Sequence, residues 1–124
     1  MTTDSSRTIA VVEDDAGVRT ALEQLLRSAG FHALTFESAE AFLEGSDINA
    51  IDCLIADINL PGISGVELVK RLGAIGQRLP AVLITGRRDP ATMELARQVA
   101  DVPRLYKPFS DEALFDVIGR AMQH

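Results

Sequence analysis

The sequence has one cysteine and no tryptophan, and aromatic residues make up only 5% of its 124 residues. A single cysteine, Cys53, cannot form an internal disulfide, so a disulfide-stabilised scaffold is excluded. Cys53 lies in an apolar run, which favours a small buried side chain. No apolar stretch approaches the roughly 18 residues that a membrane span needs, and the polar start lacks the apolar core of a signal peptide. We therefore expect a cytoplasmic protein that does not engage a membrane.

Basic residues are also scarce, with 12 Lys and Arg against 18 Asp and Glu and a net charge of −6. This balance argues against a broad footprint on a phosphate backbone, so we expect no direct nucleic-acid binding. The hydrophobic share of 47% is that of an ordinary globular chain, and the length fits one domain. The polar residues 1–7 are expected to form a flexible tail, and residues 8–124 to fold as the domain.

Short apolar runs alternate five times with amphipathic helical segments. Strands are predicted at residues 9–12, 32–36, 51–56, 81–84 and 103–107, and helices at about 18–29, from 39, 64–72, 90–100 and from 111. Ser38, Ser64 and Asp89 are predicted to cap the second, third and fourth helices. The first, third and fourth strands are apolar on both faces, which is typical of parallel strands covered by helices on both sides. The pattern predicts an α/β, flavodoxin-like, doubly wound fold with five helices and a five-stranded parallel sheet of order 2-1-3-4-5.

Polar side chains follow the predicted strands where each strand ends. They are Glu13, Asp14 and Asp15 at the end of the first strand, Asp57 and Asn59 at the end of the third, Thr85 at the end of the fourth, and Lys107 at the end of the fifth. In such sheets ligands bind at the carboxyl ends of the strands, at the point where strand order reverses. Clustered carboxylates repel one another unless a cation joins them, and their oxygens suit magnesium. The set therefore predicts a site for transfer of a phosphoryl group to a carboxylate.

Each of these residues has an ordinary structural interpretation when it is considered alone. Asp15 is suited to cap the first helix, and Asn59 to favour the turn that follows the third strand. Thr85 and Lys107 are compatible with a simple strand-end hydroxyl and a surface charge. The joint pattern, with every residue at a strand end, favours the phosphoryl-transfer site.

Four motifs resemble those of one known family. They are Val-Val-Glu-Asp-Asp at 11–15, Asp-Ile-Asn-Leu-Pro-Gly at 57–62, Ile-Thr-Gly at 84–86 and Lys-Pro-Phe at 107–109. With them the chain resembles the response-regulator receiver family, also called CheY-like, and most closely its FixJ-type branch. The resemblance covers about residues 8–122, so the domain at 8–124 is expected to be a receiver domain.

This resemblance implies roles for the residues at the strand ends. Asp57 would be the phosphoacceptor, Lys107 would contact the phosphoryl group, and Thr85 would turn its hydroxyl toward it. The implied cofactor is Mg²⁺, with Asp14 and Asp57 as carboxylate ligands, Asn59 as a ligand through its backbone carbonyl, and Glu13 as a ligand through a water. The Lys107–Pro108 bond would be cis.

The resemblance also implies partners for the chain. The phosphoryl donor would be a phosphohistidine on a histidine kinase or a histidine phosphotransfer protein. A downstream protein would bind the face formed by the fourth helix, fifth strand and fifth helix. No output domain follows about residue 122, which leaves open a single-domain regulator or a part of a longer protein.

One position departs from the family pattern. Three residues before Lys107 the family has Phe or Tyr, whose ring responds to the threonine, whereas this chain has Arg104. Tyr106 lies two residues further on, on the same strand face by alternation. We expect the switch between Thr85 and an aromatic ring to be altered or absent.

The segment after the predicted fourth strand contains two arginines. Arg87 and Arg88 are expected to lie in a solvated loop rather than to steer a phosphorylated partner or to slow hydrolysis of an aspartyl phosphate.

A constitutive binding module with vestigial phosphorylation is one alternative to the switch. Arg104 favours it, whereas the intact acidic set, Thr85 and Lys107 argue against it. A dehalogenase-type phosphatase with an Asp nucleophile is the other, although that family has Asp where this chain has Asn59.

Overall fold

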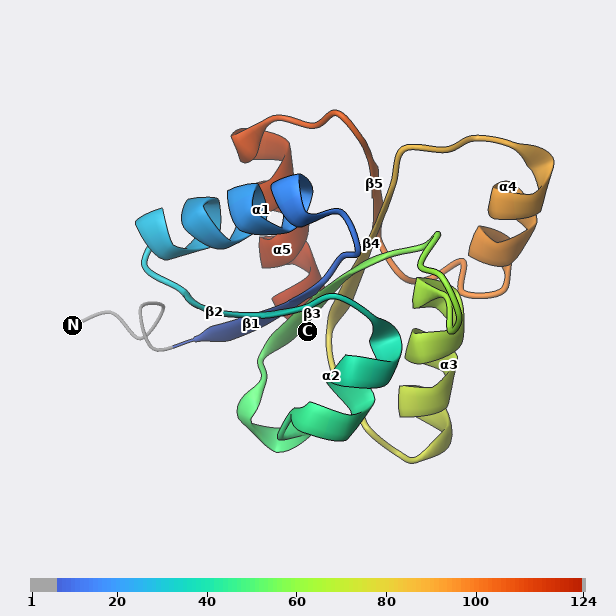
Figure 1. Ribbon diagram of the computed structural model, residues 1–124, viewed down its shortest axis with the longest axis horizontal. Helices are drawn as coiled ribbons and strands as arrows, with labels where there is room; N and C mark the ends of the chain where they lie inside the picture. The colour runs from blue at the N-terminus through green and yellow to red at the C-terminus, as the bar shows by residue number, and fades with distance from the viewer. Residues whose placement is uncertain (1–6, 124) are drawn as a thin grey trace.

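In the part of the chain that the structure describes, five parallel strands form one sheet in the order β2-β1-β3-β4-β5, as the sequence predicted. The computed structural model describes residues 7–123 (Figure 1). The predicted tail at 1–7 therefore lies outside the described residues, apart from Arg7. The strands are β1 (Thr8–Val12), β2 (His32–Phe36), β3 (Cys53–Asp57), β4 (Ala81–Thr85) and β5 (Arg104–Tyr106). The helices are α1 (Ala16–Ser28), α2 (Ala39–Gly45), α3 (Gly65–Ala74), α4 (Pro90–Arg97) and α5 (Asp111–Met122), with one 3₁₀ turn at Ile48–Ala50.

Each of the five α-helices begins after a polar residue whose side chain accepts a hydrogen bond from a backbone N–H of the first turn. The cap residues are Asp15, Ser38, Ser64, Asp89 and Ser110. Such a cap satisfies one of the N–H groups that have no partner inside the helix, and it contributes about 1 kcal/mol. The caps predicted from the sequence at Ser38, Ser64 and Asp89 are confirmed, and Asp15 caps α1.

Two strands begin later than predicted. β3 starts at Cys53 rather than at residue 51, because the Ile51 N–H bonds to the Ile48 carbonyl in the 3₁₀ turn. β5 spans only Arg104–Tyr106 rather than 103–107. Pro103 has no N–H to donate to the ladder, so the edge strand begins after it.

The fourth helix is shorter than predicted. It ends at Arg97 rather than near residue 100, and the N–H groups of Gln98 and Val99 bond to the carbonyls three residues back, at Leu95 and Ala96. This tighter bonding ends the α-helical pattern. The other elements lie close to their predicted bounds.

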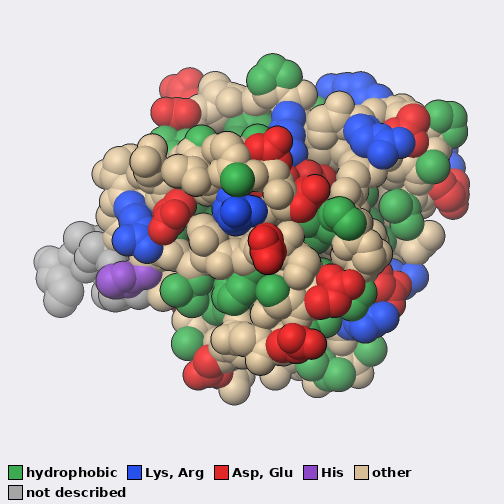
Figure 2. All heavy atoms as spheres, in the orientation of Figure 1, with side chains coloured by type: hydrophobic (Ala, Val, Ile, Leu, Met, Phe, Trp, Pro, Cys, Tyr) green, Lys and Arg blue, Asp and Glu red, His purple; other side chains and the backbone are tan. Residues whose placement is uncertain are grey.

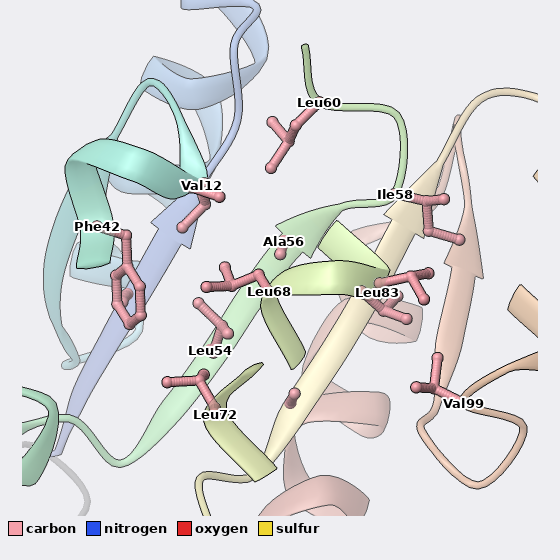
Figure 3. Packing of buried hydrophobic residues seen from close by; sticks show 14 of the residues in the cluster. Val12, Phe42, Leu54, Ala56, Ile58, Leu60, Leu68, Leu72, Leu83 and Val99 are labelled. Atoms are coloured by element: carbon pink, nitrogen blue, oxygen red, sulfur yellow. The ribbon is translucent and has the colours of Figure 1, made fainter. Parts of the chain in front are cut away.

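The sheet has a hydrophobic core on each face. Alternate residues of β1 point to opposite sides, with Ala10 and Val12 facing α2, α3 and α4 and Ile9 and Val11 facing α1 and α5. Figure 1 shows these helices as two layers around the sheet, and Figure 3 shows the first core, in which Phe42 packs among aliphatic side chains. Helices on both faces agree with the parallel architecture predicted from the apolar strands.

Cys53 belongs to the core on the side of α1 and α5. It is fully buried, and this burial raises the pKa of its thiol to about 12. The expectation of a small buried side chain is therefore confirmed.

The surface mixes charges of both signs. On the face seen in Figure 2, acidic side chains lie among basic ones. Within residues 7–123, no helix combines the length and the apolar composition that crossing a membrane requires.

Candidate functional site

The sheet topology brings three acidic side chains together. β1 pairs with β3, so Glu13 just after β1 and Asp57 at the end of β3 meet at one edge of the sheet. Ligand oxygens from the carboxylates of Glu13, Asp14 and Asp57 all lie within 4.8 Å of one another. The convergence predicted from the strand ends is therefore present in the structure.

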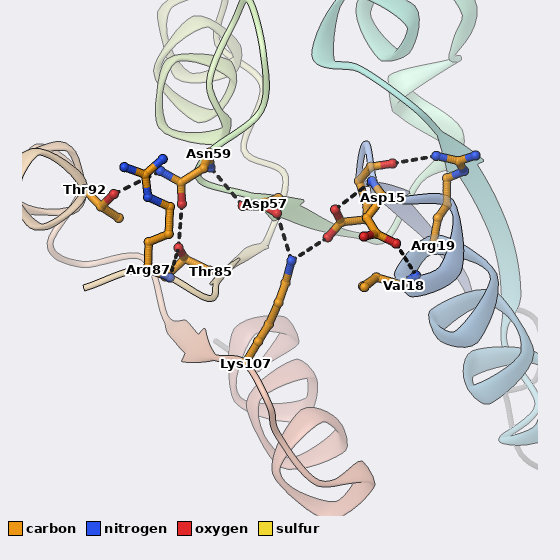
Figure 4. A network of polar contacts seen from close by, with 10 residues as sticks. Asp15, Val18, Arg19, Asp57, Asn59, Thr85, Arg87, Thr92 and Lys107 are labelled. Atoms are coloured by element: carbon orange, nitrogen blue, oxygen red, sulfur yellow. Dashed lines mark hydrogen bonds and ion pairs between the residues drawn. The ribbon is translucent and has the colours of Figure 1, made fainter. Parts of the chain in front are cut away.

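Lys107 extends from the end of β5 into this acidic cluster (Figure 4). Its Nζ lies 2.9 Å from Asp57 Oδ2 and 3.0 Å from Glu13 Oε1. Burial by itself lowers the pKa of Lys107, but the hydrogen bonds and charges of Asp57 and Glu13 outweigh it and raise the pKa above its usual value. The lysine is therefore charged at neutral pH and offsets part of the negative charge of the cluster.

Glu13 is a charged residue with no solvent exposure. Burial raises its pKa, and the charge of Asp57 adds to this effect, whereas the Asp15 N–H and Lys107 oppose it. The Asp15 N–H donates to Glu13 Oε2 at 3.0 Å. Arg19 on α1 donates to the Glu13 carbonyl at 2.8 Å, so α1 also helps to position this loop. Arg19 was not among the residues predicted for the site.

Asp57 is 6% exposed and is held from several sides. The Asn59 N–H donates to its Oδ1 at 2.8 Å, and Lys107 binds the other carboxylate oxygen. A Cβ at Gly65 would overlap the Asp57 carbonyl oxygen, so α3 can approach the end of β3 because residue 65 is glycine. The carboxylate is thus oriented before any ligand binds.

The Asn59 side chain links Thr85 to α4. Thr85 Oγ1 donates to Asn59 Oδ1 at 2.6 Å, and Asn59 Nδ2 donates to Thr92 Oγ1 at 2.9 Å. Thr92 is buried in the first turn of α4 and was not among the predicted site residues. Its place three residues after the cap Asp89 is the only sequence signal for it.

Arg104 and Tyr106, the two β5 residues that bear on the aromatic switch, both contact α4. Arg104 donates to the Ala96 carbonyl at 3.3 Å, and the Tyr106 hydroxyl contacts Met93 Sδ at 3.7 Å. They lie on the same strand face, as alternation predicted. The Arg88 guanidinium lies 3.8 Å from the centroid of the Tyr106 ring. Arg104 therefore stands where the family has an aromatic ring, and its side chain bonds to α4.

The loop residue Arg87 lies on the surface, as predicted for a solvated loop. Its Nε pairs with Asp89 Oδ1 at 2.9 Å. Arg88 is exposed as well. The Lys107–Pro108 peptide bond is cis, as the resemblance implied.

The acidic cluster fits a divalent cation by its chemistry. Three carboxylates supply hard oxygen ligands, and Mg²⁺ prefers one or two carboxylates together with waters and phosphoryl oxygens. Asp14 is exposed whereas Glu13 and Asp57 are buried, so the site is open to solvent on one side. A cation would relieve the repulsion among these groups.

A doubly wound sheet with an acidic cluster and a lysine at its carboxyl edge is typical of receiver-type signalling domains. The family model for the response regulator receiver domain matches residues 9–119. The chain therefore belongs to the response regulator receiver family of two-component systems. Receiver domains are in general signalling modules rather than enzymes, so this membership favours the switch over the phosphatase alternative.

The chain is similar to FixJ-type regulators. It is 36% identical over 115 residues to the transcriptional regulatory protein FixJ of Bradyrhizobium diazoefficiens, covering 93% of this chain and 56% of that protein. The crystal structure of FixJ-N superposes with a TM-score of 0.83 at 33% identity, covering 96% of this chain and 95% of that one. The response regulator StyR gives 0.80 at 39% identity, covering 94% and 59%. The chain spans about half the length of the curated relatives it matches.

Proposed function

We propose that the protein is the phosphoacceptor of a two-component system or phosphorelay, and that Asp57 receives the phosphoryl group. One observation supports this most strongly. Asp57 lies at the carboxyl end of β3 with two further carboxylates within 4.8 Å and with Lys107 2.9 Å from its Oδ2. This arrangement has a nucleophile, a place for a cation and a fixed positive charge in one site.

The chemistry proposed for Asp57 needs no base. An Asp57 carboxylate oxygen attacks phosphorus, a P–O bond forms, and the P–N bond of a phosphohistidine donor breaks with its electron pair staying on the imidazole. An ionised carboxylate has no proton to lose, so a histidine in the site is unnecessary. The Asn59 N–H and Lys107 hold the carboxylate in place, which reduces the cost of orientation.

Lys107 stabilises the negative charge of the transferring phosphoryl group, and the acidic residues contribute by holding a cation. Lys107 is a compact cation that can move from Asp57 to a phosphoryl oxygen within its reach. Glu13, Asp14, Asp57 and the Asn59 carbonyl would hold Mg²⁺. When bound, the metal ion supplies positive charge for the transferring phosphoryl oxygens. Thr85 has a hydroxyl at the neighbouring strand end that can donate to the same group.

Family membership supports the proposed partners. FixJ-type receiver domains work with histidine kinases, so the donor proposed here is a histidine kinase or a histidine phosphotransfer protein in the cytoplasm. Phosphorylation would shift the chain between two conformations by stabilising one of them. A downstream protein would bind at α4, β5 and α5.

Intact-mass analysis tests the phosphoacceptor directly. With MgCl₂ and acetyl phosphate, the wild type is expected to gain the mass of one phosphoryl group and Asp57→Asn to gain none. Asp101→Asn removes the same charge from an exposed loop and is expected to label like the wild type. Equal labelling of wild type and Asp57→Asn would refute the assignment.

A constitutive binding module remains the second candidate, because Arg104 bonds to the Ala96 carbonyl where the family has an aromatic ring. In that case phosphorylation would not alter binding. Partner affinity that is the same with and without beryllofluoride would favour this second function.

A further inference from the structure

The Asn59 amide lies between the end of β4 and the start of α4. It accepts from Thr85 at 2.6 Å and donates to Thr92 at 2.9 Å. Figure 4 shows the amide between the two hydroxyls. Thr85 and Thr92 are each 1% exposed, so water does not readily replace a lost partner at either hydroxyl.

Further contacts complete a closed ring of hydrogen bonds around the loop between β4 and α4. Thr92 Oγ1 donates to Asp89 Oδ1 at 2.9 Å, and Arg87 Nε donates to the same oxygen at 2.9 Å. The Arg87 backbone N–H then donates to Thr85 Oγ1 at 3.1 Å. The ring therefore joins the loop after β3, the end of β4 and the first turn of α4.

In each hydrogen bond between side chains of this ring, only one of the two groups can be the donor. An ionised Asp89 carboxylate only accepts, so the Thr92 hydroxyl must donate to it and can only accept from Asn59. Asn59 then presents its NH₂ to Thr92 and its oxygen to Thr85. Since the Arg87 N–H also only donates, the single proton of the Thr85 hydroxyl is committed to Asn59.

One proton cannot serve two acceptors at full strength. If Thr85 donates to a phosphoryl oxygen on Asp57, Asn59 Oδ1 loses its donor, and an unsatisfied polar group in this setting costs free energy. The amide must then turn or find a new partner, which disturbs its bond to Thr92. The state of Thr85 is thereby linked to the start of α4.

We propose that the Asn59 amide is a positioning group that transmits the state of Thr85 to α4 through Thr92, without an aromatic residue at position 104. This inference depends on the proposed phosphorylation of Asp57. Arg104 is bonded to the other end of the same helix at Ala96, so it is not the group that meets Thr85. The ring takes the place of the aromatic switch in coupling the site to α4.

Thr92→Val tests this route because it keeps the shape of the side chain and removes the hydroxyl, at a residue outside the phosphorylation site. The probe is beryllofluoride with Mg²⁺, observed by amide NMR and hydrogen exchange. In the wild type, the amide of Met93, which bonds to the Asp89 carbonyl, is expected to exchange on the order of tenfold faster when the probe binds, the effect of losing about one hydrogen bond. In Thr92→Val this exchange is already fast and no longer responds.

The Arg87 amide separates transmission from a general defect. It bonds directly to Thr85, so it is expected to shift with the probe in both wild type and Thr92→Val. A merely structural defect would abolish the response at both amides. Thr92→Ser restores the hydroxyl and is expected to restore the Met93 response. Thr35→Val removes a hydroxyl on β2 and is expected to behave like the wild type.

The two proposals fail in distinguishable ways. If beryllofluoride binds and Met93 responds in Thr92→Val as in the wild type, the transmission through Asn59 is wrong and the phosphoacceptor assignment stands. If the wild type shows no binding of beryllofluoride at Asp57, the phosphoacceptor assignment fails and the transmission fails with it.

Discussion

Asp14→Asn is expected to change the stability of the protein in opposite directions with and without magnesium. Asp14 lies exposed beside two buried carboxylates, with ligand oxygens within 4.8 Å. Without a cation, the Asp14 charge is repelled by the net negative charge of Glu13, Asp57 and Lys107. With a cation it is a ligand. The substitution therefore removes an unfavourable interaction in one condition and a favourable one in the other.

The magnitude of the repulsion follows from Coulomb's law. At 4.8 Å, the upper limit of the separations between these oxygens, two unit charges interact by about 0.9 kcal/mol in water and about 3.5 kcal/mol at an effective dielectric constant of 20. Asp14 is exposed, and Lys107 offsets part of the charge of Glu13 and Asp57, so the value near the aqueous limit applies. Asp14→Asn should thus raise the free energy of unfolding by about 1 kcal/mol without metal, or the Tm by about 4 °C for a domain of this size.

Magnesium should reverse this order. At a free concentration of about 100 times its Kd, a ligand that binds only the folded state stabilises it by about 2.7 kcal/mol, which corresponds to a rise of about 10 °C in Tm. Asp14→Asn loses a ligand, so most of this rise should disappear. The wild type is then the more stable protein.

The measurement is a pair of thermal unfolding curves for each protein, one in EDTA and one in MgCl₂. Asp101→Asn, which removes an exposed charge away from the cluster, serves as the control and should follow the wild type in both. An equal rise in the Tm of wild type and Asp14→Asn with Mg²⁺ would refute the role of Asp14 as a metal ligand. A lower stability of Asp14→Asn than of the wild type in EDTA would refute the repulsion.

Three further predictions concern the core, the thiol and the α4 cap. Phe42→Ala removes a fully buried ring that packs edge-on against Phe36 and should lower the free energy of unfolding by about 3–5 kcal/mol in urea titrations; a loss below about 1 kcal/mol would contradict the packing. Cys53, with its pKa raised to about 12 by burial, should resist iodoacetamide at about pH 8 in the native protein and react in urea, and rapid native labelling would count against its burial. The bond from the Thr92 hydroxyl lowers the pKa of Asp89 below 3.8, so the stabilisation from this cap is present above that pH and is lost as the pH falls through the lower pKa of the folded state. The stability difference between wild type and Asp89→Ala should accordingly shrink on acidification, and a difference that does not change with pH would disprove this contribution.

Local chemistry determined much of the fold. The caps at Ser38, Ser64 and Asp89 were predictable because a short polar side chain before an apolar helical pattern has a local partner, the N–H of the first turn. The strands were predictable where apolar residues run together, as in β4. Parallel topology followed from burial on both faces, and the strand order then placed Glu13, Asp57 and Lys107 at one edge.

Other features depended on bonds that the local pattern does not reveal. The end of α4 was predicted too late because apolar periodicity continues past Arg97, while the backbone changes to bonds between residues three apart. β3 was predicted to begin too early, because the 3₁₀ turn at Ile48–Ala50 uses the N–H of an apolar residue that resembles the strand.

The composition and spacing of the sequence alone determined the class of fold, the helix caps and the acidic residues that gather at the strand ends. Only the tertiary structure decided which of two neighbouring acidic residues is buried: Glu13 is buried and Asp14 is exposed. It also decided that Asn59 joins Thr85 to Thr92. The physical reason is that burial and side-chain hydrogen bonds depend on the direction of each side chain and on partners far away in the chain, whereas caps and periodicity depend on residues only a few positions apart.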